Sequence, residues 1–171
     1  MLLSRAAVAA IVLSLWMGAG PAEPTFGQER VAGSISVRSA NRDVTLSQSD
    51  LKKVARHEQR VEVEGATDPT TVSGVFLWDL LQLARVPSPT ASGRQRAVMY
   101  VKLTGADGQS AVLALAEADP GFSKRIVIVA DRSNGQPLDD SEGPWRVFIP
   151  DDLRHARWIR GLVSIEVATI K

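Results

Sequence analysis

The residues best suited to binding chemistry lie near the end of the sequence. The segment GPWRVFIPDDLRHARWIRGLVSIEV, residues 143–167, carries four arginines and a histidine, although the formal net charge of the chain is only +1. Guanidinium groups suit phosphate and sulfate because two parallel N–H donors match two oxygens. If the chain folds back at the Pro-Asp-Asp turn, these side chains converge. The predicted cofactor- or anion-binding residues are Arg146, Arg154, His155 and Arg157.

A second interpretation of the same segment gives the arginines no ligand. Acidic side chains occur throughout the region and would neutralise the arginines in ion pairs: Asp139, Asp140, Glu142, Asp151 and Asp152. Adjacent acids in polar turns are usually solvated or capping residues. From the residues alone, an anion site and a neutralised surface both remain open.

The sequence lacks the common motifs of catalysis. It contains neither a G-x-S-x-G elbow nor a G-x-x-x-x-G-K-[ST] phosphate loop, and His57 lies far from His155. No cysteine occurs, which excludes disulfides, thiolate catalysis and thiolate ligation of a metal. No catalytic and no metal-binding residue is therefore predicted.

The N-terminus is typical of an export signal. A short cationic start, MLLSR, precedes the apolar run AAVAAIVLSLWMGAG, and Gly20-Pro21-Ala22 provides a small-x-small cleavage pattern. We expect a signal peptide over residues 1–22, a periplasmic or secreted protein, and no transmembrane segment in the mature chain. Cleavage would remove Arg5 and no acid, leaving a formal charge of zero. Nucleic-acid binding then has no electrostatic basis.

The remaining sequence predicts a flexible lead-in over residues 23–33 and a single domain over residues 34–171. Strands are predicted near residues 33–39, 60–65, 126–130, 145–150 and 162–170, and a hairpin turns at Asp107-Gly108. A short helix should begin after Ser47 and run to about Ala55, and a largely buried helix should cover residues 72–86. Residues 88–96 are predicted as loop, residues 116–122 as a short helical turn, and Asn134-Gly135 as a turn.

The order of these elements indicates the fold class. Strands outnumber helices, the helices are short, and no alternation of strand and helix occurs. We therefore predict an α+β fold of mixed β-sheets with short helices rather than a doubly wound α/β fold.

Three stretches in this order are familiar. They are GVFLWDLLQLARV, KLTGADGQSAVLALAEA and IVIVADRSNGQPLDDSEGPWRVFIPDDLRHARWIRGLVSIEV. Over residues 58–168 they resemble the molybdopterin-binding domain of the sulfite-oxidase family of oxidoreductases. The resemblance implies the sulfite-oxidase fold and a closing segment whose basic residues help to hold the phosphate of the cofactor. Arg157 falls where the family has a lysine before tryptophan, and Arg154 at a commonly basic position.

The sequence also departs from the family pattern. Family enzymes bind molybdenum through a cysteine thiolate, which would fall near Glu64-Gly65, and this chain has none. Glu142 replaces a histidine that family members often place before the Gly-Pro pair. A soft thiolate cannot be exchanged for a carboxylate without changing the preferred metal and its redox potential.

Three hypotheses follow. The first is an exported, non-catalytic domain that binds a small anion or a periplasmic protein and holds no cofactor, although the resemblance suggests molybdopterin. The second is a molybdopterin-binding oxidoreductase with a non-thiolate metal site. Against it stands the single arginine in MLLSR, since export after cofactor loading would use a twin-arginine signal. The third is a periplasmic subunit that docks another protein through the polar loop DRSNGQPLDDSEGP.

Overall fold

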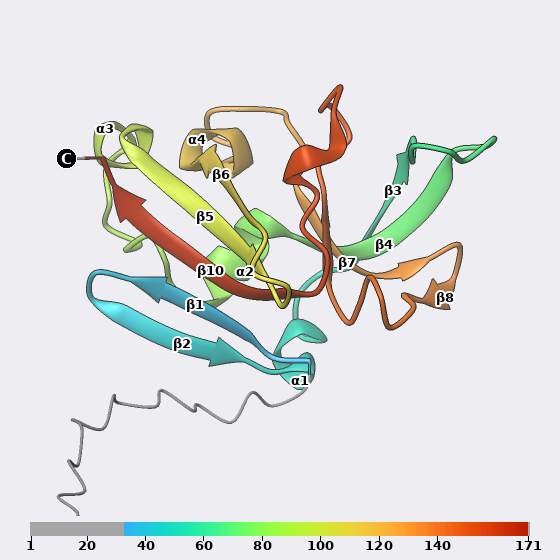
Figure 1. Cartoon of the computed structure of the whole chain (residues 1–171). Helices are drawn as coiled ribbons and strands as arrows, with labels where there is room; N and C mark the ends of the chain where they lie inside the picture. Colours follow the sequence, from blue (N-terminus) through green and yellow to red (C-terminus); the bar gives the residue numbers. More distant parts are fainter. Residues whose placement is uncertain (1–32, 171) are drawn as a thin grey trace, which may run out of the picture.

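The structure is a computed structural model, and it describes residues 33–170 (Figure 1). The predicted signal peptide and all but the last residue of the predicted lead-in lie outside the described residues. The described chain forms two five-stranded β-sheets, and four short α-helices and one 3-10 turn connect or flank the strands. The α+β class predicted from the sequence is confirmed.

The first sheet has the strand order β2-β1-β10-β5-β6. Its strands, in that order, are Arg42–Leu46, Ile35–Ser39, Leu162–Thr169, Met99–Gly105 and Ser110–Ala114. Strand β10 runs parallel to β1 and antiparallel to β5, and Figure 1 shows it between them. The β5–β6 hairpin turns at Asp107-Gly108, as predicted, where Gly108 has a φ of 86°.

The second sheet contains the strand order β3-β4-β7-β8, and β9 pairs with β7. These strands are His57–Val61, Thr70–Phe76, Ile128–Ser133, Gln136–Pro137 and Arg146–Phe148. Asn134 and Gly135 turn the chain between β7 and β8 with positive φ values of 48° and 77°, as the sequence predicts. The Asn134 amide nitrogen also donates to the Thr71 carbonyl, which fixes this turn to β4.

The helices are short and several begin with a side-chain cap. They are α1 (Gln48–Leu51), α2 (Leu77–Leu83), α3 (Gly93–Ala97) and α4 (Leu115–Ala118). Ser47 accepts a hydrogen bond from the Asp50 amide, and the Asp50 carboxylate accepts one from the Ser47 amide. This capping box explains why α1 starts where the sequence predicts.

One hydrophobic core joins both sheets and α2. Side chains with no exposed surface come from the first sheet, the second sheet and the helix: Ile35, Leu103, Ile165, Val75, Val129 and Leu80. Gly74 of β4 is required by the close approach of β7 within the second sheet, because an added Cβ would lie 2.1 Å from the Val129 carbonyl oxygen.

Four local predictions were wrong. The chain over residues 72–76 is strand, and α2 begins only at Leu77, because the apolar run mixes the strand and helix periods. Helix α1 ends at Leu51 rather than near Ala55. Residues 88–96 are not all loop, since Ser92 caps α3 through a box with Gln95.

The fourth error bears on the candidate site. The predicted strand over residues 60–65 is displaced, because β3 ends at Val61. From Glu62 the chain leaves the sheet and forms a loop up to Pro69 before β4 begins. The charged residues of this stretch therefore face a cavity instead of alternating along a strand.

Candidate functional site

The arginine-rich segment folds around the buried ring of Trp158. This residue follows the 3-10 turn η1 (His155–Arg157), and only 3% of its surface is exposed. The imidazole of His155 stacks on the indole with ring centroids 3.7 Å apart, and Phe148 meets it edge-on at 5.1 Å. The indole Nε1 donates to the Ile149 carbonyl at 3.1 Å. Trp158 thus fixes the position of His155.

Arg146 is a buried residue of β9. Its guanidinium forms an ion pair with Glu142 and lies 4.6 Å from the ring centroid of Phe148. Only 5% of Arg146 is exposed, so the charge is sheltered from water and is compensated by a carboxylate four residues earlier. Arg146 is therefore a core residue whose charge is paired within the chain.

Arg157 lies at the centre of a tertiary charge network. Its Nε and Nη2 donate to the two oxygens of Asp152 at 2.9 and 2.6 Å, a bidentate arrangement. The same guanidinium donates to Glu117 of α4 at 3.3 to 3.4 Å, and Glu117 also accepts a hydrogen bond from Arg125. The Asp152 hydrogen bonds, with Glu117 beyond them, raise the pKa of Arg157 above its usual range despite burial.

The ionisation of Glu117 reflects the same network. Burial acts to raise the pKa of its carboxyl group, but hydrogen bonds from Arg157, the Ala114 amide and Arg125 outweigh that effect. The pKa of Glu117 is consequently lower than its ordinary value of 4.5. The carboxylate is ionised at neutral pH and shares its charge between two arginines.

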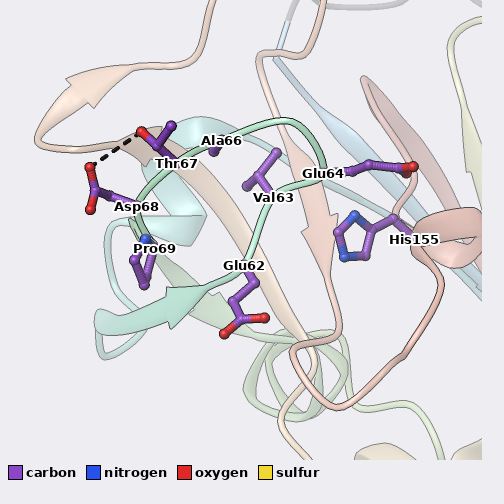
Figure 2. A pocket seen from close by; sticks show the side chains of 8 residues that line it. All are labelled: Glu62, Val63, Glu64, Ala66, Thr67, Asp68, Pro69 and His155. Atoms are coloured by element: carbon purple, nitrogen blue, oxygen red, sulfur yellow. Dashed lines mark hydrogen bonds between the residues drawn. The ribbon is translucent and has the colours of Figure 1, made fainter.

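A cavity of about 370 Å³ lies between the loop after β3 and the arginine-rich segment. Figure 2 shows the His155 imidazole facing this loop beside Glu64. Its lining residues are Glu62, Val63, Glu64, Ala66, Thr67, Asp68, Pro69 and His155. Three of them are carboxylates and none is lysine or arginine, so an anion would be repelled here.

Of the four predicted residues, His155 alone lines this cavity. Arg146 and Arg157 lie in their ion pairs, and Arg154 is exposed to solvent. That these four residues bind one ligand stays a prediction. Glu142 and Asp152 do neutralise arginines, as the second interpretation expected.

Sequence reasoning missed the contribution of Glu117 and Arg125. Glu117 lies 40 residues before Arg157, and no periodicity in the sequence links the two positions. The only local signal is the position of Glu117 at the third residue of a short helix.

Within residues 33–170, no group of three or more His, Asp or Glu side chains could hold a metal ion. No helix in this range is long and apolar enough to cross a membrane.

Comparison with known proteins assigns the fold and then the family. The structure is similar to the sulfane dehydrogenase SoxCD from Paracoccus pantotrophus, with a TM-score of 0.58 and 15% sequence identity. The match covers 79% of this chain and 38% of the SoxCD chain, so the chain spans well under half of that relative. No curated protein matches. The family model for the oxidoreductase molybdopterin binding domain matches residues 30–170, and the chain belongs to this family. The resemblance seen in the sequence is confirmed.

The residues present do not fit molybdopterin as the family binds it. The loop at residues 62–69, where the resemblance places the metal-binding thiolate, provides carboxylates and no sulfur. Arg157, at the position of a phosphate-binding lysine, is already bound by Asp152 and Glu117. The donor set therefore lacks the soft ligand for the metal, and the cation at the lysine position is already paired within the chain.

Proposed function

We propose that this chain is an exported, non-catalytic member of its family that acts as a binding module for a partner protein. One observation carries the proposal. The loop that would supply a thiolate instead lines a cavity with carboxylates, and the 171 residues contain no cysteine at all. The sulfite-oxidase scaffold is then retained for its shape.

The charges of the arginine-rich segment favour a protein partner over a small free anion. Three of its four arginines, Arg146, Arg157 and Arg160, pair with carboxylates of the same chain, and the adjacent cavity carries three further carboxylates. A segment of another protein that presents a lysine or arginine would be attracted to such a cavity. Leu153, 98% exposed and two residues before His155, offers an exposed apolar side chain in the arginine-rich segment.

The absence of catalysis is tested by cofactor content. The full chain is produced in a host that synthesises molybdopterin, with a cysteine-containing family enzyme expressed in parallel as the loading control. We expect molybdenum and pterin well below one per chain. Molybdenum in one-to-one amount, with sulfite- or sulfoxide-dependent electron transfer, would overturn the proposal in favour of a non-thiolate oxidoreductase.

Export is tested in the same preparation. Protein recovered from the periplasm should begin at Glu23 when its N-terminus is sequenced. A chain that keeps Met1 and stays with the cytoplasmic fraction would contradict export.

Partner binding is tested by affinity capture from a periplasmic extract. The double variant Glu62→Gln/Glu64→Gln neutralises two carboxylates of the cavity without changing their size. The matched control, Glu58→Gln, neutralises an exposed carboxylate of β3 that is not among the lining residues. We expect the captured protein to be lost with the double variant and kept with the control. Equal capture by both would exclude the cavity as the docking site.

A further inference from the structure

The carboxylate of Glu117 occupies a position that has the features of an oxyanion-binding site. Its Oε1 accepts from the Ala114 amide at 3.0 Å, and its two oxygens accept from the guanidinium of Arg157. Arg125, eight residues after Glu117, donates to Oε2. Two guanidinium groups and one backbone amide therefore converge on a single carboxylate, which is how proteins hold small oxyanions.

The site combines local and tertiary contacts, because Ala114 and Arg125 lie three and eight residues from Glu117 and Arg157 lies 40 residues away. Arg157 belongs to η1, Arg125 lies in the connection after α4, and Ala114 ends β6. These three segments meet only in the folded chain. Both guanidinium groups are partly sheltered, with 29% of the Arg157 side chain and 34% of the Arg125 side chain exposed. An ion of a few atoms could reach them from solvent.

We propose that Arg125, Arg157 and the Ala114 amide form an oxyanion site that Glu117 fills from within the chain, with Asp152 covering the remaining face of Arg157. The native protein is thereby closed to external carboxylate or phosphate at this point. Removing the internal carboxylate opens the site to a small oxyanion from solvent. The inference is independent of the proposed partner, since it concerns residues outside the cavity at residues 62–69.

The physical basis is the loss of hydrogen-bond acceptors between two guanidinium groups. Without Glu117, Arg157 keeps its bidentate pair with Asp152, and Arg125 keeps only longer contacts of 4.0 Å to Asp151 and Asp152. The donors that pointed at Glu117 then face a space of carboxylate size. A free acetate, formate or phosphate ion can restore the lost hydrogen bonds, because it presents oxygens with the same spacing. Chloride is spherical and cannot accept the paired bonds in the same way.

The test uses Glu117→Ala in the full chain. Thermal unfolding is followed in sodium chloride, sodium acetate and sodium phosphate at matched ionic strength. The matched control is Asp131→Ala, because Asp131 and Glu117 are equally exposed at 27% but Asp131 pairs with Arg56 alone. We expect Glu117→Ala to have a lower Tm than the native protein in chloride and to recover at least half of the loss in acetate or phosphate. Exchanging chloride for acetate or phosphate should raise the Tm of the native protein and of Asp131→Ala by the same smaller amount, because such anions stabilise folded proteins generally.

A second variant and a second measurement keep the proposal testable if Glu117→Ala does not fold. If Glu117→Ala does not fold, Asp152→Ala opens the bidentate face of Arg157 and is compared in the same salts. Phosphate binding is also measured by isothermal titration, with at least tenfold tighter binding expected for the variant than for the native chain. The proposal would be overturned if acetate raised the Tm of the variant no more than that of the native protein. It would also be overturned if the native chain bound phosphate as tightly as the variant.

Discussion

Replacing Trp158 tests whether the arginine-rich segment is anchored by the core. In Trp158→Ala the chain loses an indole that is 3% exposed, its stacking on His155 and its hydrogen bond to Ile149. Truncating a buried Trp costs about 3 to 5 kcal/mol of unfolding free energy. For a chain of this length, each kcal/mol lowers Tm by about 2 to 4 °C. We therefore expect a Tm lower by about 6 to 20 °C.

The measurement is urea denaturation followed by circular dichroism, with Trp158→Phe as the matched control. Phenylalanine keeps an aromatic ring but lacks the indole N–H, so it should cost less, about 1 to 2 kcal/mol. A loss below about 1 kcal/mol in Trp158→Ala would show that the ring contributes little packing. It would refute the view that Trp158 holds His155 beside the cavity.

Two further predictions concern the charge network and the sheet packing. The depressed pKa of Glu117 stabilises the fold above the ordinary value of 4.5, and this contribution is lost as pH falls through the lower folded pKa. Urea midpoints should therefore fall less steeply in Glu117→Gln than in the native chain below pH 4.5. Gly74→Ala should lose more than about 3 kcal/mol or fail to fold, because the Val129 backbone blocks the added methyl group. Gly65→Ala, with no atom nearby but a φ of 85°, should cost only about 1 kcal/mol.

The sequence predicts those parts of the fold that short-range chemistry determines. The turns at Asp107-Gly108 and Asn134-Gly135 need positive φ, and glycine provides it. The Ser47–Asp50 capping box is likewise readable from spacing alone. Strand β4 could not be separated from α2, because the apolar residues of β4 continue into the helix with no turn signal between Phe76 and Leu77.

The candidate site was predictable only in part. An excess of arginine beside aspartate indicates either a ligand or an ion pair, and local pairing of Arg146 and Arg157 could be anticipated from nearby acids. The contact between Glu117 and Arg157 could not be anticipated, because it depends on how α4 packs against a segment 40 residues away. The cavity could not be predicted either, because it forms where β3 ends earlier than the alternating valines of the sequence suggest.

The place of β10 has a consequence for how the molecule is made. The strand synthesised last in the described chain, Leu162–Thr169, sits in the interior of the first sheet and bonds to both β1 and β5. Until β10 is synthesised, β1 and β5 lack the strand that lies between them. Pairing between strands so far apart in the sequence is slow. The first sheet therefore closes only once residues 162–169 are available to pair with both β1 and β5. A chain truncated before residue 162 would leave β1 and β5 with unpaired edges, which are prone to pair with other chains.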